Sequence, residues 1–392
     1  MSTASSTPPD QHDSTTNLPV EVEVEVGHYR SLPVLISYLL VALILTASIV
    51  RRLYRRYRYL KTQSPTEWLT RRRHVAVFTL LAILSLGSTW YYMFAFFAYS
   101  YHDWACGRGL VGGDGWSVKR LELWLRDTKL FKEAWETVSE TPQRFWWSGQ
   151  IFLWTVGWSV FLGLMGRRYK IPKVWTYMLL GQIVAISFAK SLFYLSVILY
   201  RPVVAGNRAS EELWTPHPSL EVLSLMISLL SSAVVPYIPH TSYFLPILLV
   251  PHLLLFIPAI LSPQILPEGL QSIHRSPEAV TKQYSTIFKW LLGIVLLMHA
   301  QATYSALADG SPVPLRRASD SCRFESSQGT SHEPWRRLLG TMSEHPAVSS
   351  VGWDVVFCTV EFLTWTAVNG FSAKQILGEA AVESGGVREK DE

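Results

Sequence analysis

Long apolar segments recur along this chain, and each has a length that suits the hydrocarbon core of a bilayer. A transmembrane helix needs about 20 mostly apolar residues, and backbone amides inside a bilayer must be satisfied within helices or closed barrels. The sequence therefore predicts an all-α, multi-pass transmembrane helix bundle of about eight spans. The predicted spans cover residues 32–50, 75–99, 149–166, 173–198, 219–236, 242–262, 284–305 and 349–370.

The composition agrees with a membrane protein. The 392 residues are 49% hydrophobic and only 17% charged, whereas a typical soluble domain has about 25% charged residues. The net charge of +5 is modest, and it is concentrated beside apolar segments, which indicates membrane orientation and no nucleic-acid partner. The three cysteines are too few and too scattered for a disulfide framework.

Three regions follow from these patterns. Residues 1–30 are rich in Ser, Thr, Asp and Pro and are predicted to form a disordered polar tail. Residues 31–372 are predicted to form the helix bundle, and residues 373–392 a flexible C-terminal tail. Within the bundle, the sixth span contains several prolines, so we expect it to be kinked or broken.

Two connecting segments have patterns of their own. Residues 116–140, between the second and third spans, carry apolar residues at helical spacing with charges between them. This pattern predicts an interfacial amphipathic helix, which is either a plain surface helix or a lid over a cavity. The polar segment 306–349 is expected to be a cytosolic surface loop with a short amphipathic piece around Trp335 and Leu338.

Short basic segments predict the orientation. Residues 51–73 hold nine Lys or Arg, and residues 167–173 hold four. Short loops rich in Lys and Arg stay on the cytosolic side of a membrane. With eight spans, both termini are then expected on the lumenal side.

The last span carries two carboxyl groups. Successive helical residues turn by about 100°, so Asp354, Cys358, Glu361 and Trp365 form one stripe. A charged side chain at the bilayer centre costs about 2.5–3.5 kcal/mol, so this stripe is expected to face a protein interior or a wet cavity. The two acids either supply a proton to a reaction or hold another helix by hydrogen bonds.

Other polar residues lie inside predicted spans. Lys190 either pairs with an acid of the last span or extends towards headgroups. His252 and His299 are each either a satisfied interior residue or a base, and Gln182 is a candidate for orienting a polar substrate group. The chain has no Walker loop, G-x-S-x-G, H-E-x-x-H or dinucleotide glycine fingerprint. We therefore expect chemistry without a cofactor and without a metal.

Several stretches carry a family resemblance: "WLRDTKLFKEAW", "RFWWSGQIFLW" and "YMLLGQIVAISFAKSLFYL" between Leu123 and Leu195, and "HPAVSSVGWDVVF" before the final helix. They resemble fungal membrane-bound terpene cyclases of the ascochlorin, ascofuranone and macrophorin pathway type. The resemblance implies cyclisation of a farnesyl chain attached to an aromatic or quinol head. The reaction would begin with protonation of a terminal epoxide or alkene.

This resemblance suggests a mechanism for the polar residues. Asp354 or Glu361 would donate the initiating proton, aromatic faces would stabilise the cations, and the second carboxylate or His299 would take the final proton. The apolar substrate would enter from the membrane lipid, and the expected compartment is the endoplasmic reticulum. The alternative function is a small-molecule transporter or channel. The candidate catalytic residues are Asp354, Glu361 and His299, and the candidate substrate-binding residues are Gln182, Lys190, Tyr194, Phe188, Trp353, Trp365 and His252.

Overall fold

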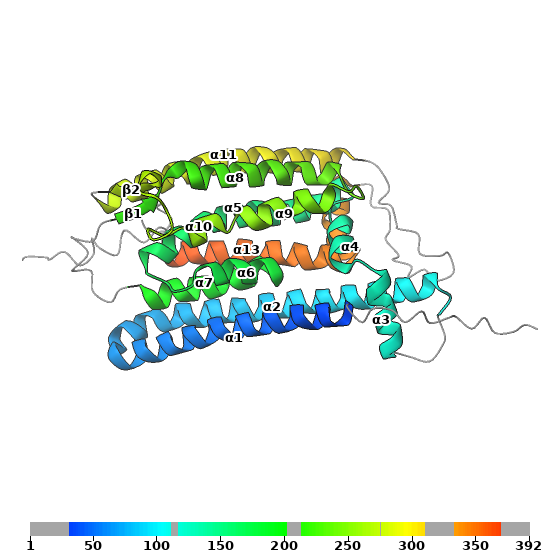
Figure 1. The fold of residues 1–392 in the computed structure, drawn as a ribbon, viewed down its shortest axis with the longest axis horizontal. Coiled ribbons are helices and arrows are strands. Elements are labelled where there is room, and N and C mark those ends of the chain that lie inside the picture. The colour runs from blue at the N-terminus through cyan, green and yellow to red at the C-terminus, as the bar shows by residue number, and fades with distance from the viewer. Residues whose placement is uncertain (1–30, 111–116, 202–212, 275, 310–332, 370–392) are drawn as a thin grey trace, which may run out of the picture.

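The chain folds into an all-α bundle, apart from one two-stranded antiparallel ribbon (Figure 1). The predicted tails lie outside the residues that the computed structural model describes. The described residues are 31–110, 117–201, 213–274, 276–309 and 333–369.

Six helices are long and apolar enough to cross a membrane, which is compatible with an integral membrane protein. Two of them, α1 and α11, lie on opposite sides of the bundle (Figure 1) and leave large apolar side chains uncovered, such as Val34 at 68% and Leu297 at 74% exposure. Exposed apolar surface of this extent marks a membrane or partner surface. The six helices are α1 (Ser31–Gln63), α2 (Pro65–Gly107), α5 (Pro142–Arg168), α8 (Pro218–Val234), α11 (Pro277–Ala308) and α13 (Pro346–Asn369).

Local sequence signals set several helix starts. Ser64 separates α1 from α2, and Pro65 accounts for the break because a proline disfavours helical geometry in the residue before it. Thr141 caps α5 by accepting a hydrogen bond from the Arg144 amide, and Pro142 follows at the first helical position. The same cap-then-proline pattern therefore places the N-terminus of the most buried long helix.

The predicted span 173–198 is not one helix. It divides into α6 (Trp175–Ile183) and α7 (Ile186–Tyr200), with Ala185 in an extended conformation between them. The two halves run antiparallel, since the Tyr177 hydroxyl lies 2.5 Å from Oγ of Ser196. We call α6–α7 the re-entrant pair.

Contacts with α1 show that the re-entrant pair enters and leaves at the same end of the bundle. Arg52 donates to the Pro172 carbonyl at 2.8 Å, just before α6. Arg56 donates to the Leu199 carbonyl at 3.2 Å, at the end of α7. The expectation of a single crossing is wrong because the chain reverses halfway, at Val184 and Ala185. Neither residue is a proline or a glycine, so the local sequence does not indicate a break.

The predicted break in the sixth span is confirmed. It consists of α9 (Phe244–Leu254) and α10 (Ile257–Ile260), and Pro251 lies inside α9. Oγ of Ser159 donates to the Leu255 carbonyl at 2.9 Å, so a neighbouring helix satisfies a backbone group at the break.

The segment 116–140, predicted as one amphipathic helix, forms two helices, α3 (Val118–Asp127) and α4 (Leu130–Thr137), which run across the direction of the long helices (Figure 1). Thr128 is extended (φ −104°, ψ 150°) and separates them. The expected amphipathic piece near Trp335 is confirmed as α12 (Pro334–Gly340). Short elements complete the fold: β1 (Leu213–Pro216) paired with β2 (Gln271–His274), and the 3-10 turns η1 (Val235–Tyr237), η2 (Glu268–Leu270) and η3 (Thr341–Ser343).

The bundle has two distinct ends (Figure 1). The basic end holds residues 51–73 and 167–173, and the cap end holds α3, α4 and α12. Gln143 donates to the Ala306 carbonyl at 3.2 Å, so α11 finishes at the cap end. The described parts of 306–349 therefore lie away from the basic segments, which contradicts the prediction that placed this loop on their side.

The positions at which the chain enters and leaves the bundle also differ from the prediction, which placed both termini on one side. Helix α1 begins at the cap end, where Val34 lies near α3 and α4. Helix α13 finishes at the basic end, where Arg201 donates to Asn369 at 3.4 Å. The chain thus enters and leaves the bundle at opposite ends.

Candidate functional site

The polar stripe of α13 faces the interior of the bundle. Asp354 is 8% exposed, Cys358 and Glu361 are 0% exposed, and Trp365 is 2% exposed. Four residues at spacings of four, three and four along the helix are thus all covered by neighbouring helices.

Asp354 closes the N-terminus of α7. The Ser187 amide donates to its Oδ1 at 2.8 Å, and the Ile186 amide donates to its Oδ2 at 3.1 Å. The first amides of a helix have no intrahelical acceptor, and a carboxylate there also interacts favourably with the helix dipole. Asp354 therefore fixes the tip of the re-entrant pair to α13.

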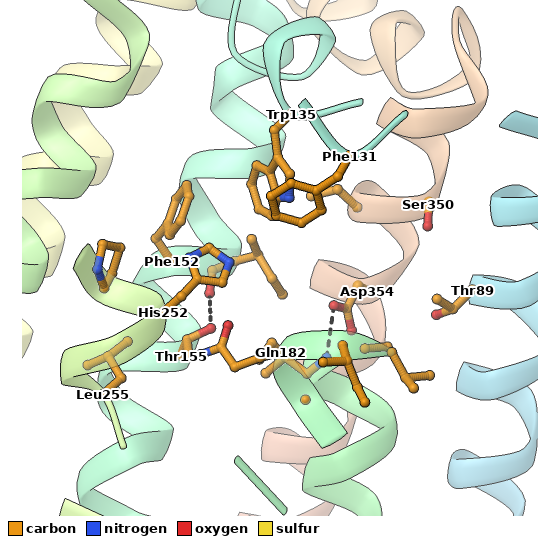
Figure 2. A pocket seen from close by; sticks show the side chains of 18 residues that line it. Thr89, Phe131, Trp135, Phe152, Thr155, Gln182, His252, Leu255, Ser350 and Asp354 are labelled. Atoms are coloured by element: carbon orange, nitrogen blue, oxygen red, sulfur yellow. Dashed lines mark hydrogen bonds between the residues drawn. The ribbon is translucent and has the colours of Figure 1, made fainter. Parts of the chain in front are cut away.

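A cavity of about 200 Å³ lies at this tip, in the middle of the bundle (Figure 2). Asp354 lines it together with Gln182 and His252, two other residues that the sequence singled out. In Figure 2, Gln182 lies between His252 and Asp354 on the floor of the cavity. The other labelled wall residues are aromatic, aliphatic or weakly polar: Phe131, Trp135, Phe152, Thr155, Thr89, Leu255 and Ser350.

The contacts of His252 determine which of its two ring nitrogens carries the proton in the neutral form. Its Nδ1 lies 2.7 Å from the Leu248 carbonyl oxygen, which can only accept, so Nδ1 donates. In the neutral ring the other nitrogen, Nε2, then keeps its lone pair and is a potential base. The ring packs edge-on against Trp135 and Phe152, with centroids 5.7 and 6.2 Å apart.

A second group of predicted residues lies deeper along α13 and does not line the cavity. Nζ of Lys190 donates to the Cys358 carbonyl at 2.8 Å and lies 4.1 Å from the centroid of a Trp154 ring. Tyr194 stacks on Trp365, with centroids 4.5 Å apart. The direct contacts of Lys190 are therefore a carbonyl and an aromatic face, and its interaction with the Glu361 carboxyl group is electrostatic, without a direct ion pair.

Glu361 belongs to this deeper group. Its Oε1 accepts from Oγ of Ser191 at 2.8 Å, and its Oε2 has no hydrogen-bond partner among the described residues. Glu361 lies seven residues beyond Asp354, a rise of about 10.5 Å. The two acids therefore share a helix face but occupy different surroundings.

Three predicted residues lie elsewhere. Phe188 is buried in the main apolar core, and Trp353 is 37% exposed on the outer side of α13 beside Phe357. His299 is half-buried on α11, with its ring 5.7 Å from that of Trp146. The structure does not bring these three side chains to the cavity.

Most cavity residues were not proposed from the sequence as site residues, and two of these are aromatic side chains of one helix. Phe131 and Trp135 belong to α4 and form part of the cavity wall (Figure 2). Their spacing of four residues marked the apolar face of the amphipathic segment. That signal indicates a covered face, but it does not indicate what the face covers.

An apolar cleft adjoins the cavity. This outer cleft has a volume of about 850 Å³ and is bounded by α1, α2, α3, α4 and α13. It shares six lining residues with the cavity: Phe131, Trp135, Gln182, Ile183, Ser350 and Val351. The cavity and the outer cleft are therefore neighbouring compartments whose common border is formed by side chains of α4, of the re-entrant tip and of α13.

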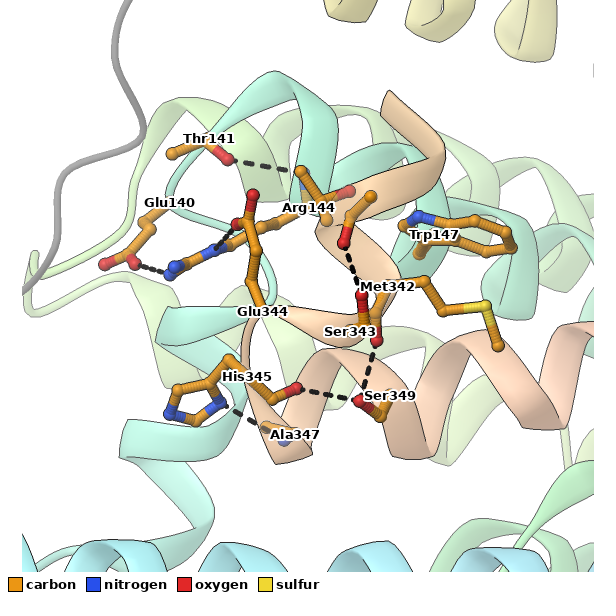
Figure 3. Close-up of polar contacts among 12 residues, drawn as sticks. Glu140, Thr141, Arg144, Trp147, Met342, Ser343, Glu344, His345, Ala347 and Ser349 are labelled. Carbon is orange, nitrogen blue, oxygen red and sulfur yellow. Dashed lines mark hydrogen bonds and ion pairs between the residues drawn. The ribbon is translucent and has the colours of Figure 1, made fainter. Parts of the chain in front are cut away.

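A polar cluster occupies the cap end (Figure 3). Arg144 forms an ion pair with Glu140, and its Nε lies 3.8 Å from Oε2 of Glu344. Nδ1 of His345 accepts from the Ala347 amide at 3.1 Å. Burial raises the pKa of Glu344, although the charge of Arg144 opposes this rise. The cluster surrounds a separate cavity of about 70 Å³ and lies outside the Asp354 site.

Among the residues that the structure describes, no group of three or more His, Cys, Asp or Glu side chains is arranged to hold a metal ion. Comparison of the chain with protein-family models, with curated proteins and with solved structures gives no match.

Proposed function

We propose that this protein is an integral-membrane terpene cyclase that cyclises a prenyl chain after protonating its terminal epoxide or alkene. The observation that supports this proposal best is the position of Asp354. Its carboxyl group borders a cavity with several aromatic walls inside an apolar bundle. The proposed acid is the protonated form of this group: apolar burial favours it and makes it a general acid, while the two backbone amides favour the carboxylate that remains after the proton is transferred.

The proposed first step transfers the proton of neutral Asp354 to the substrate. With an alkene, the π electrons form a C–H bond and leave a tertiary cation; with an epoxide, the proton binds oxygen and the C–O bond breaks. The amides of Ile186 and Ser187 lie 3.1 and 2.8 Å from the two oxygens, so they would stabilise the carboxylate that remains. Such preorganised donors assist because they need no rearrangement during the step.

The proposed later steps use the cavity walls. The faces of Trp135, Phe131 and Phe152 are placed to stabilise a positive charge that moves along the chain, by about 0.5–2 kcal/mol each. His252 replaces His299 as the proposed final base, since its Nε2 is unprotonated in the neutral ring and it lines the same cavity. Loss of one proton to this base makes the product an isomer of the substrate. Exclusion of water protects the cation from quenching.

The resemblance to fungal membrane-bound terpene cyclases is consistent with this assignment, and its third stretch, residues 177–195, covers most of α6 and α7. It therefore includes Gln182 and the amides that bind Asp354. The proposed partners are an apolar prenylated substrate and membrane lipid.

We also propose seven membrane crossings in place of eight. The six long helices and the broken α9–α10 pass from one end of the bundle to the other, whereas the re-entrant pair returns to its own end. The basic end is then cytosolic, and α3 and α4 lie at the opposite interface. Cys106, at the cap end, is disulfide-bonded, which fits an oxidising lumen and supports the endoplasmic reticulum as the compartment.

A second candidate function is a small-molecule transporter. Helices that break inside a membrane commonly form substrate or ion sites in transporters, and the re-entrant pair is such a break. In this protein the free amides at the break already bind Asp354. A transporter would move a labelled substrate across vesicles without changing it, whereas a cyclase would convert it.

The experiment compares variants in membranes of a heterologous host supplied with a farnesylated aromatic substrate in epoxide and alkene forms. We expect Asp354→Asn to lower conversion at least 100-fold, in line with loss of a general acid. Because Asp354 also accepts from the Ile186 and Ser187 amides, the Tm of the variant is measured beside its conversion, and a folded but inactive variant separates loss of the acid from loss of this cap. Glu268→Gln makes the same chemical change at an exposed site and serves as the matched control. Full activity of Asp354→Asn would reject the site, and no conversion by the parent protein would reject the enzyme.

A further inference from the structure

The cavity at Asp354 is small for the proposed substrate. Its volume is about 200 Å³, whereas pockets that bury a drug-sized ligand usually have about 300–1,000 Å³. A farnesyl chain with an aromatic head belongs to that larger size class. The outer cleft, at about 850 Å³, supplies the missing volume next to the cavity.

The lining of the outer cleft is mainly apolar, but its rim on α4 is basic. Lys129 and Lys132 both line the cleft. Lys132 is paired with Glu136 at 3.1 Å. Glu133 accepts from the backbone amide of Lys129 at 3.0 Å, so this carboxylate serves the start of α4. Among the described residues no acid pairs with the Lys129 ammonium group, which is exposed.

The acid, the aromatic residues and the lysine lie in a definite order from the inner cavity to the outer cleft. Asp354 lies at the inner wall, Phe131 and Trp135 border both compartments, and Lys129 lies on the outer cleft only. A ligand that reaches from Lys129 to Asp354 crosses the common border of the two compartments, where Phe131 and Trp135 face Gln182, Ile183, Ser350 and Val351 as lining residues. An apolar chain suits that passage, and an anionic group suits its outer end.

We infer that the site binds a single-chain amphiphile with an acidic head, such as a carboxylate or phenolate. The head lies in the outer cleft at Lys129 with Lys132 beside it, and the distal end of the chain passes Phe131 and Trp135 to reach Asp354. This inference rests on the proposed function for the identity of the chain as prenyl. It adds the charge of the head group, the direction of binding and the residue that selects the head.

A photolabelling experiment in membranes containing the full chain tests the inference without turnover. The probe is a farnesyl-length chain with a carboxylate head and a diazirine at its distal end, and its twin has an uncharged carboxamide head. We expect both probes to label peptides that contain Trp135, Gln182 or Asp354, and the acidic probe to label at lower concentration. Lys129→Gln should weaken labelling by the acidic probe about tenfold, as loss of a charge-assisted hydrogen bond does, and leave the carboxamide twin unchanged.

The matched control is Lys282→Gln. Lys282 also lines an apolar groove, of about 560 Å³, but this groove lies between α8 and α11. This variant should label like the parent protein, and unchanged labelling by the carboxamide twin shows that Lys129→Gln is folded.

Three results would overturn the inference: labelling centred on the groove at Lys282, equal weakening of both probes by Lys129→Gln, or displacement of the probe by an excess of phosphatidylglycerol, which would make the cleft a lipid site. Failure of the proposed function gives a different result. Labelling as expected, without conversion of any prenyl substrate, would support this binding site and contradict the cyclase.

Discussion

Two carboxyl groups on one face of α13 have different surroundings. Asp354 accepts two backbone hydrogen bonds and borders a cavity. Glu361 accepts one hydrogen bond from Ser191 and is enclosed by packed side chains. The helical spacing predicted that both acids face inward, and this is what the structure has. Helical spacing could not predict which acid borders a cavity. That difference comes from α4, α6 and α9, whose positions depend on the whole bundle.

The first prediction concerns Lys190 and Glu361, which are both buried and interact electrostatically. Removing one member of a buried charged pair leaves the other uncompensated and costs about 3–5 kcal/mol. We therefore expect Lys190→Met and Glu361→Gln each to destabilise the detergent-solubilised protein by about this amount. The double variant should lose much less unfolding free energy than the sum of the losses of the two single variants.

A double-mutant cycle of unfolding free energies measures this coupling. Thr364→Val, at a half-buried position of α13, is the control and should change stability little. Additive losses from the two substitutions would show that Lys190 and Glu361 act independently.

The second prediction concerns Glu344, whose pKa is raised by burial. A carboxyl group with a raised folded-state pKa stabilises the fold when protonated, so its contribution is present at low pH and is lost as pH rises through that pKa. Glu344→Gln should therefore raise the apparent Tm at pH 7, by about 2 °C, and give no gain at pH 4.

The comparison is made between variant and parent because other ionisable groups line the same cavity. These groups are Asp103, Glu133, Glu140, Arg144 and His345; all are present in both proteins, so the difference in Tm reports the change at residue 344 together with its contact to Arg144. An equal change in Tm at both pH values would contradict the role given to Glu344.

At the scale of single elements, the fold depends on contacts between helices that local sequence patterns do not predict. The reversal at Val184 and Ala185 has no helix-breaking residue, and the carboxylate that binds the start of α7 comes from Asp354, 168 residues from Ile186. Sequence patterns could predict the six long helices and the proline-broken α9–α10, because length, apolar content and proline are local signals. They could not predict the re-entrant pair, because its stabilising contacts are distant in sequence.

The third prediction compares two glycines of α5. A Cβ at Gly163 would lie 2.3 Å from the Pro258 carbonyl oxygen of α10, whereas a Cβ at Gly157 would have nothing within 4 Å. Gly163→Ala must push α10 away and should destabilise the protein by about 1–3 kcal/mol. Gly157→Ala should be neutral or stabilise the helix by up to about 1 kcal/mol.

Thermal unfolding in detergent distinguishes the two alanine variants. The hydrogen bond from Arg167 to the Pro258 carbonyl, 2.8 Å long, should also weaken in Gly163→Ala. Similar stabilities of the two variants would contradict the close packing of α5 against α10.

At the scale of the whole molecule, the re-entrant pair changes the topology. An eight-span count places both termini on one side, and seven crossings place them on opposite sides. The sequence predicted the all-α class and the clustering of basic residues at one end, and both agree with the structure. The number of crossings could not be predicted, since a hydropathy pattern measures the length of a segment and not its direction.

The fourth prediction tests this topology. We expect a glycosylation acceptor fused before residue 1 to be modified in the endoplasmic reticulum, and one fused after residue 392 to remain unmodified. The loop 306–349 should also accept glycosylation, because its described parts lie at the cap end. Modification of both terminal acceptors, or of neither, would support an even number of crossings.

The most direct test of Asp354 as the initiating acid measures the incorporation of deuterium from the solvent into the product. Washed membranes in D₂O, without any added cofactor, are given the alkene form of a farnesylated aromatic substrate, with parent protein or Asp354→Asn. We expect the parent to form a cyclic isomer that carries one deuterium on the carbon that was protonated, and Asp354→Asn to form almost none. A cyclic product without deuterium, or equal deuterated product from Asp354→Asn, would contradict Asp354 as the acid that starts the reaction.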